Sequence, residues 1–232
     1  MVGPVSADLA ATLRAAVPEP TRPPSAAQQV ASVLRRQIVD GHLRPGTHLV
    51  EETVGTTLGF ARNTVREAFA LLAVERLIVR EAHRGVLVAT PTSADIADLY
   101  ALRRIIEPAA VEHGPESAQA AAAELTAIVA AGTAANAAGD RDGVAQANQA
   151  FHRRLTAMSG SRRVGEVMEA ALAEMRLVFN AMDADRTFHA DFLERNRGIA
   201  DLLAAEDRRG AAAELRAYLD AARDRLLSGG EA

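Results

Sequence analysis

The sequence predicts a mainly helical protein: an N-terminal winged helix-turn-helix of mixed α and β structure, followed by an all-α antiparallel bundle of about six helices. Three observations support this. A turn glycine, Gly59, precedes an apolar helical stripe, two β-rich runs flank residues 81–85, and helical periodicity continues from Ser93 onward. The 232 residues are enough for a small domain and a larger one, each with its own core.

The first helix is expected over residues 25–40, where apolar side chains recur on one face. A tight turn over 43–47 and a short strand over 48–50 then lead to a second helix over 51–58. Gly55 lies inside this second helix, where a glycine costs ~1 kcal/mol relative to Ala. We therefore expect a close approach of the neighbouring helix at Gly55.

Residues 59–69 have the pattern of the turn and second helix of a helix-turn-helix. Gly59 permits the positive φ that a sharp turn needs. The helix that follows has an apolar stripe formed by Val65, Phe69 and Leu72. Arg62, Asn63 and Arg66 lie off that stripe, on the face where a recognition helix meets base edges and phosphates. Taken alone, these residues also fit an ordinary amphipathic helix with solvated arginines. The flanking sequence is needed to distinguish this interpretation from a recognition helix.

That flanking pattern is a β-hairpin. The β-rich runs at 77–80 and 86–89 enclose a tip with His83, Arg84 and a permissive Gly85. Helix, strand, helix, turn, helix and hairpin in this order make a winged helix-turn-helix. A winged helix that serves only protein contacts is the alternative that these residues leave open.

Residues 25–90 resemble the GntR family of bacterial transcription regulators. The motif positions of that family are matched at Leu43–Gly46, Leu58–Gly59, Arg62, Val65–Ala68 and Arg84–Gly85. The resemblance implies binding to a pseudo-palindromic operator in double-stranded DNA through Arg62, Asn63, Thr64, Arg66, His83, Arg84 and Gly85. Ala61 departs from the family, which usually has a capping Ser there, and Glu51–Glu52 stands where a cation often accompanies one acid. Both departures bear on DNA affinity and not on the binding mode.

Composition and charge exclude several classes of protein. The chain has no Cys, so a disulfide framework and a thiolate metal site are both impossible. We find no run of about 18 apolar residues and no signal-peptide pattern, so we expect a cytoplasmic protein without a membrane segment. Residues 1–90 have a net charge of +2 and residues 91–232 a net charge of −6, which mildly supports nucleic-acid binding by the first part.

Three segments are expected: a Pro-rich, disordered leader over 1–24, the winged helix over 25–90, and an all-helical effector-binding and dimerisation domain over 91–232. The helices of the last segment are expected at 93–112, 116–138, 140–158, 161–182, 188–205 and 207–227, with breaks at 114–115, 139, 159–160 and 183–185. Helices of this length form an antiparallel bundle.

Periodicity places five polar residues on the inner faces of these helices: Arg103, Asn148, His152, Asn196 and Tyr218. Polar groups that converge inside a bundle indicate a small-molecule pocket, and hydrogen-bonded core residues are the alternative. A buried guanidinium cannot remain unpaired, so Arg103 needs Glu107 at i+4, another acid, or a ligand anion. We expect the ligand anion.

Residues 93–227 also resemble, more weakly, the ligand-sensing domain of the FadR subgroup of the same family. Many such domains hold a divalent metal through an Asp and three His, and the metal and an Arg hold a carboxylate effector. The ligand positions are Asn148, His152, Asn196 and Tyr218 in this chain, so we expect no metal and no other cofactor. Arg103 matches the carboxylate-binding Arg, which implies an acidic effector such as a carboxylate or an acyl thioester.

The sequence as a whole predicts a homodimeric transcription repressor whose operator affinity changes when a small acidic metabolite binds the helical domain. The alternative is an effector-independent DNA-binding protein whose helical domain serves only dimerisation. An enzyme is not expected, because no nucleophile, phosphate loop or carboxylate pair accompanies His152, the candidate general base.

Overall fold

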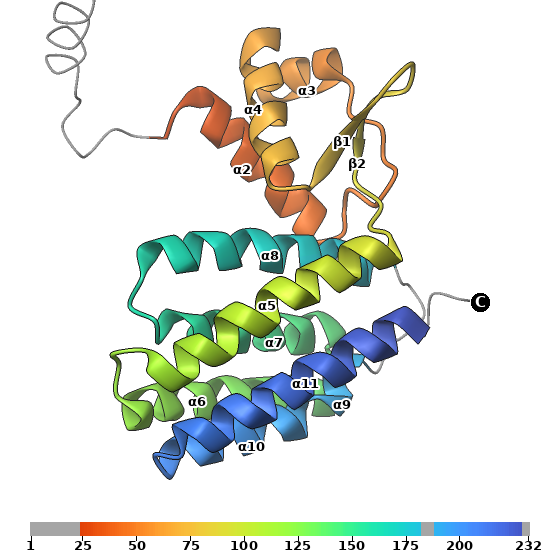
Figure 1. Ribbon diagram of the computed structural model, residues 1–232. Coiled ribbons are helices and arrows are strands. Elements are labelled where there is room, and N and C mark those ends of the chain that lie inside the picture. Colours follow the sequence, from red (N-terminus) through yellow and green to blue (C-terminus); the bar gives the residue numbers. More distant parts are fainter. Residues whose placement is uncertain (1–23, 182–187, 229–232) are drawn as a thin grey trace, which may run out of the picture.

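The computed structural model describes residues 24–181 and 188–228, and its elements follow the predicted order (Figure 1). The winged helix consists of α2 (Ala26–Val39), α3 (Glu51–Leu58), α4 (Arg62–Val74), β1 (Ile78–Glu81) and β2 (Gly85–Val88). The bundle consists of α5 (Ser93–His113), α6 (Ala118–Ala137), α7 (Arg141–Ala157), α8 (Arg162–Ala181), α9 (Phe188–Asp191), α10 (Leu193–Ala204) and α11 (Arg208–Ser228). The predicted fold class is confirmed. Residues 1–23 of the expected leader and the expected break at 183–185 lie outside the described residues.

Two expected elements differ from the prediction. The helix expected over 188–205 is divided into α9 and α10, because Phe192 lies between them in a turn. The strand expected over 48–50 is reduced to one bridge, His48 to Leu87. Leu49 N still donates to the carbonyl of Val86 at 2.8 Å, but Val50 is already the N-cap residue of α3, so pairing ends there.

The turn between α3 and α4 is tight because two glycines allow it. Gly59 ends α3 in the left-handed region with φ 75°. A Cβ atom on Gly55 would lie 2.8 Å from the carbonyl oxygen of Phe60. The close approach expected at Gly55 is therefore present: the backbone of the turn lies nearest, and Val65 Cγ2 of the neighbouring helix α4 lies 3.6 Å from the same Cβ position.

The wing is an antiparallel hairpin, as predicted. Ile78 pairs with Val88 and Glu81 pairs with Gly85. The tip turns through two positive φ values, 65° at His83 and 83° at Gly85. The hairpin tip extends away from the helices of the domain (Figure 1).

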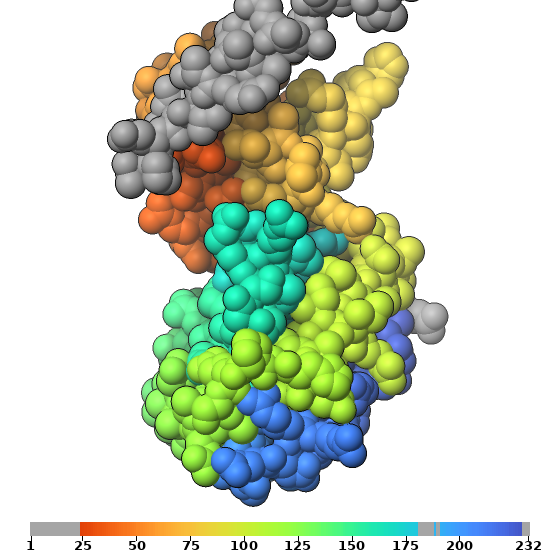
Figure 2. Space-filling view, turned by 60° about the vertical axis from the view of Figure 1, so that its left-hand side comes forward, coloured from red at the N-terminus to blue at the C-terminus, as the bar shows by residue number. Residues whose placement is uncertain are grey.

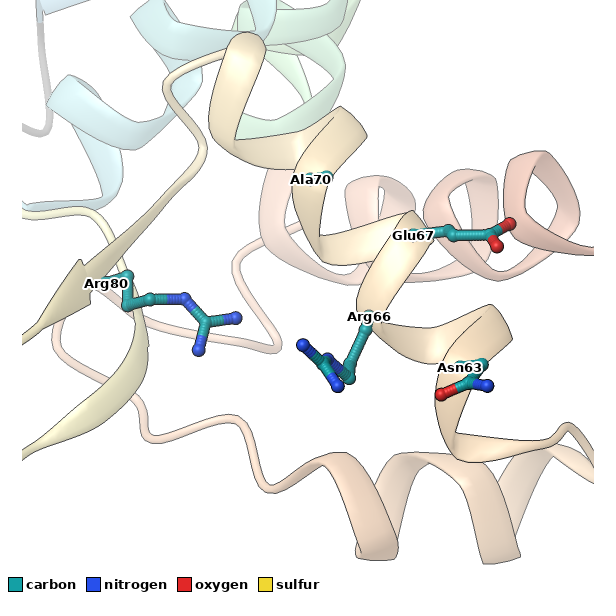
Figure 3. Close-up of a pocket in the computed structure, with 5 residues that line it drawn as sticks. All are labelled: Asn63, Arg66, Glu67, Ala70 and Arg80. Atoms are coloured by element: carbon teal, nitrogen blue, oxygen red, sulfur yellow. The ribbon is translucent and has the colours of Figure 1, made fainter.

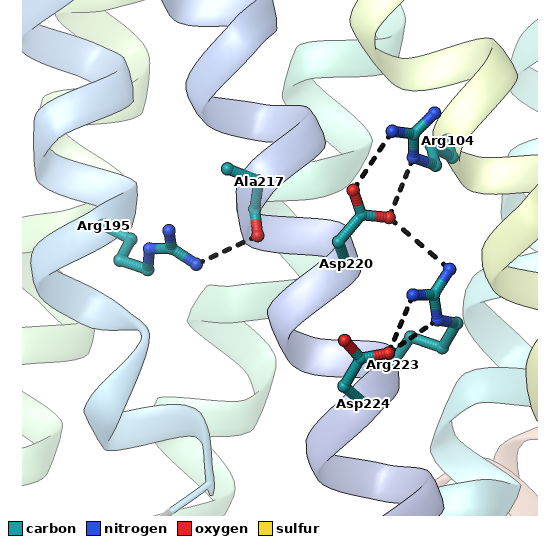
Figure 4. A network of polar contacts seen from close by, with 6 residues as sticks. All are labelled: Arg104, Arg195, Ala217, Asp220, Arg223 and Asp224. Carbon is teal, nitrogen blue, oxygen red and sulfur yellow. Dashed lines mark hydrogen bonds and ion pairs between the residues drawn. The ribbon is translucent and has the colours of Figure 1, made fainter.

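In the bundle, α5 packs along α11, and α6 contacts both α7 and α10. Ion pairs on the surface connect α5 to α11: Arg104 Nε donates to Asp220 Oδ1 at 2.8 Å (Figure 4). Arg223 lies 3.5 Å from the same carboxylate. Exposed pairs of this kind contribute little, about 0–1 kcal/mol, so the buried core holds the bundle together.

Helix α6 corrects the expectation that no segment of the chain could span a membrane. Its 20 residues have a mean hydropathy of 1.2 over an 18-residue window, which meets that criterion by length and composition. The segment was missed because its apolar character is spread over alanines. Leu125 and Val129 of α6 belong to the bundle core, so α6 packs as one helix of the bundle.

Helix α8 packs against both parts of the molecule (Figures 1 and 2). Leu177 belongs to the core of the winged helix, whereas Met175 belongs to the core of the bundle. Arg176 Nε and Asn180 Nδ2 donate to the carbonyl groups of the last two residues of α2, at 3.1 and 3.0 Å. These carbonyls have no partner within their own helix, so α8 completes the end of α2.

We expect Gly55→Ala to destabilise the protein by about 1–3 kcal/mol, because the new Cβ would meet a backbone carbonyl that the turn holds in place. Gly165→Ala in α8 is the matched control, since nothing lies within 4 Å of its Cβ position. That substitution should stabilise the helix by about 0.5–1 kcal/mol. Urea denaturation followed by circular dichroism should show the two midpoints moving in opposite directions. A Gly55→Ala protein as stable as the parent would contradict the assigned contact.

Candidate functional site

The outward face of α4 presents three polar residues. Arg62, Asn63 and Arg66 are exposed, while the stripe formed by Val65, Phe69 and Leu72 is buried as predicted. Thr64 is half-buried. Ala61 is the N-cap residue and makes no side-chain capping bond, which agrees with the expected departure at this position.

A hollow of about 540 Å³ lies between α4 and β1 (Figure 3). It is lined by Asn63, Arg66, Glu67, Ala70 and Arg80. The guanidinium groups of Arg66 and Arg80 face one another across it. Each guanidinium group is a forked donor that can bind the oxygen and nitrogen acceptors of bases and phosphates.

Sequence reasoning missed Arg80 as a site residue. Side chains two apart on a strand share a face, so Arg80 lies on the same face as Ile78, whose side chain is buried toward α4. Because Arg80 is near the end of β1, its side chain reaches past the core to the hollow. The alternation in the β-rich run was the signal that could have identified it.

The carboxylate of Glu51 lies near both Arg66 and Arg80. Its Oε1 is 3.9 Å from both Arg66 Nε and Arg80 Nη2, which is too long for a hydrogen bond. The carboxylate therefore draws the two cations together without occupying their donors. At the wing tip His83 and Arg84 are exposed, and Arg84 Nη1 donates to Glu81 at 2.7 Å.

The five polar residues expected inside the bundle are all buried, and none is more than 6% exposed. They come from four helices: α5, α7, α10 and α11. The convergence predicted from helical periodicity is therefore present. Glu107, which the sequence offered only as a possible partner of Arg103, lies at the centre of the group.

Glu107 connects two of these residues. Its Oε1 accepts from Arg103 Nε at 2.6 Å, and its Oε2 lies 2.6 Å from His152 Nδ1. Burial opposes the negative charge, but Arg103 and His152 hold the pKa of Glu107 below its usual range. Burial lowers the pKa of His152 although Glu107 favours its charged form. An imidazole that donates Nδ1–H to an ionised carboxylate fits the lowered pKa of Glu107.

The hydrogen bonds continue from His152 to α10. His152 Nε2 lies 3.1 Å from the Tyr218 hydroxyl, which lies 3.1 Å from Asn148 Oδ1. Asn196 Nδ2 donates to the same oxygen at 3.1 Å. Burial raises the pKa of Tyr218, so the phenol remains a hydroxyl.

Two buried polar atoms of the described residues have no partner: Arg103 Nη2 and Asn196 Oδ1. Native proteins leave few buried polar atoms without a hydrogen bond, so each requires an explanation. From the sequence, a ligand anion and not Glu107 was expected to pair with Arg103. That expectation is corrected for Nε, which Glu107 occupies, and only Nη2 remains open.

The buried group does not fit a metal ion. Both nitrogens of His152 are engaged by other residues, and its neighbours Asn148, Asn196 and Tyr218 are neutral groups that bind transition metals poorly. Within residues 24–181 and 188–228, no three or more His, Cys, Asp and Glu side chains are grouped as a metal site. We therefore assign no chemistry to a metal at this position.

Two family models match adjacent parts of the chain. The model described as bacterial regulatory proteins, gntR family, matches residues 26–88, and the FCD domain model matches residues 98–221. A crystal structure described as a GntR transcriptional regulator from Rhodococcus sp. RHA1 is 36% identical, with a TM-score of 0.79. The match covers 88% of this chain and 99% of that chain.

Curated relatives share a shorter region. The gluconate operon transcriptional repressor of Bacillus subtilis (strain 168) is 38% identical over 79 residues, which are 34% of this chain and 32% of that protein. The HTH-type transcriptional repressor RspR of Escherichia coli (strain K12) is 38% identical over 88 residues, which are 38% of each protein. The chain thus spans about a third of the length of these relatives.

We expect Arg103→Met to destabilise the protein by about 3–5 kcal/mol, because it leaves the Glu107 carboxylate buried without its cation. The double variant Arg103→Met, Glu107→Gln should recover most of that loss, since no uncompensated charge remains. Denaturant titrations of both variants measure the difference. Equal stability of the single and double variants would show that the pair is not coupled.

We also expect purified protein to hold no stoichiometric transition metal after dialysis. Elemental analysis of the full chain is the measurement. Finding about one Zn²⁺, Ni²⁺ or Mn²⁺ per chain, lost on His152→Ala, would reveal that His152 binds a metal together with ligands other than Asn148, Asn196 and Tyr218.

Proposed function

The chain belongs to the GntR family of bacterial regulatory proteins and has an FCD domain, and on this premise we propose that it is a homodimeric, cytoplasmic transcription repressor. Residues 25–90 are the DNA-binding domain, and residues 91–232 bind an effector and form the dimer. The effector weakens operator binding when it occupies the helical domain.

The observation that best supports DNA binding is the exposed face of α4, which adjoins the hollow lined by Arg66 and Arg80. We propose that Arg62, Asn63 and Arg66 contact base edges and phosphates in the major groove, with Arg80 on the adjoining backbone. His83, Arg84 and Gly85 of the wing follow the minor groove or the phosphates. Two copies related by a two-fold axis then match a pseudo-palindromic operator.

A continuous set of contacts supports communication between the two domains. The effector residues Asn148 and His152 lie on α7, and Gln149 of the same helix donates to the carbonyl of Leu172 on α8 at 3.0 Å. Helix α8 in turn completes the end of α2 through Arg176 and Asn180. A shift of α7 on effector binding therefore moves α8 and changes the spacing of the two DNA-binding domains.

The alternative is a helical domain that serves only dimerisation. The Arg103–Glu107 pair alone would suit such a structural core. The open atoms Arg103 Nη2 and Asn196 Oδ1 favour a ligand instead, because a purely structural network gains nothing from buried groups without partners.

We expect Arg66→Ala to weaken specific operator binding by about 1–3 kcal/mol, because it removes a forked donor and no core contact. Arg80→Ala should weaken binding to all sequences more evenly and reduce the salt dependence. Gel-shift titrations at fixed salt, against operator and scrambled duplexes, separate the two effects. Arg162→Ala is the matched control, since that side chain is 85% exposed at the first residue of α8, outside the winged helix. Unchanged operator affinity of the Arg66→Ala protein would refute the assignment.

A further inference from the structure

The guanidinium groups of Arg66 and Arg80 have room to move and donors to offer. Within residues 24–181 and 188–228 neither group makes a hydrogen bond, and the two side chains are 62% and 65% exposed. Besides the hollow of Figure 3, a second hollow of about 130 Å³ adjoins both side chains between α4 and the hairpin. Packing therefore does not fix either arginine, and each long side chain loses conformational freedom when DNA orders it.

One anion lies close to both cations. Glu51 Oε1 is 3.9 Å from Arg66 Nε and 3.9 Å from Arg80 Nη2, and no other carboxylate of the described residues forms an ion pair with these arginines. The Glu51 side chain is only 25% exposed, so salt screens its charge less than it screens a fully exposed one. Glu51 also lies in the first turn of α3, where the helix dipole favours a negative charge.

We propose that Glu51 is a positioning residue for sequence-specific DNA recognition. Its carboxylate holds Arg66 and Arg80 together before DNA arrives, and it makes binding to phosphates alone less favourable than binding to base edges. The proposal rests on the proposed function and adds to it a residue that determines specificity without touching DNA.

The preference for bases follows from the charges. A phosphate that binds the two arginines is a second anion beside the Glu51 carboxylate, so the two anions repel each other and compete for the same cations. The acceptors of a guanine edge, O6 and N7, have no net charge, so Arg66 can bind them while Glu51 remains its counter-ion. Glu51 therefore weakens phosphate-only binding to an unrelated duplex more than it weakens binding to the operator.

The test compares Glu51→Gln with the parent full-length chain in gel-shift titrations. The specific duplex is one that the parent protein selects from a randomised pool, and the other is a scrambled duplex of the same composition. Glutamine keeps the shape of the side chain and removes its charge. We expect the ratio of specific to scrambled affinity to fall about fivefold, mainly because the scrambled duplex binds more tightly. On that duplex the plot of log affinity against log salt concentration should steepen by about one.

Glu52→Gln is the matched control. Glu52 is the next residue of α3, is exposed, and forms no ion pair among the described residues. The substitution removes the same charge from the same helical turn, so it accounts for the general electrostatic effect and should leave the affinity ratio unchanged. Thermal unfolding of each variant identifies a structural effect, because a loss of folded protein lowers binding to both duplexes equally.

A double variant tests whether Glu51 acts through the two arginines. In an Arg80→Ala background the pair no longer exists, so Glu51→Gln should change the affinity ratio much less than it does in the parent. An equal fall in both backgrounds would overturn the proposal, and so would a Glu51→Gln protein with the affinity ratio of the parent. Either result leaves the proposed function standing. A parent protein that binds neither duplex would overturn the proposed function, and this inference with it.

Discussion

The interior of the helical domain depends on the carboxylate of Glu107. Four helices bring Arg103, Asn148, His152, Asn196 and Tyr218 into one buried space, where polar groups are unfavourable unless they are paired. Glu107 neutralises Arg103 with one oxygen and orients His152 with the other, and His152 then sets the position of Tyr218.

Helix α8 connects this interior to the DNA-binding surface. Its two faces lie in two cores, and its side chains bond to the end of α2. Helices α2 and α4 pack together in the winged helix, so the position of α2 fixes that of the arginine face. We propose that a small movement in the bundle is transmitted to the winged helix through these packed helices.

Local chemistry made much of this predictable from the sequence. Gly59 and Gly85 adopt the positive φ values that glycine favours. The apolar residues of α4 recur with helical spacing, which predicts one buried face. Helical periodicity likewise placed the five polar residues on inner faces. Two features were not predictable in the same way. The partner of Arg103 depended on the rotamers of neighbouring helices, since Glu107 at i+4 and a ligand anion were equally compatible with the pattern. Arg80 was missed because its role depends on how far β1 extends beyond the core toward α4.

The central claim is that an ionised Glu107 holds both Arg103 and the Nδ1–H of His152 inside the bundle. The most direct measurement is the ¹⁵N chemical shift of both imidazole nitrogens of His152 in the full-length protein near neutral pH. We predict a protonated Nδ1, because this nitrogen lies 2.6 Å from Glu107 Oε2. A bare Nδ1 would show that His152 does not donate to Glu107, and that result would contradict the account.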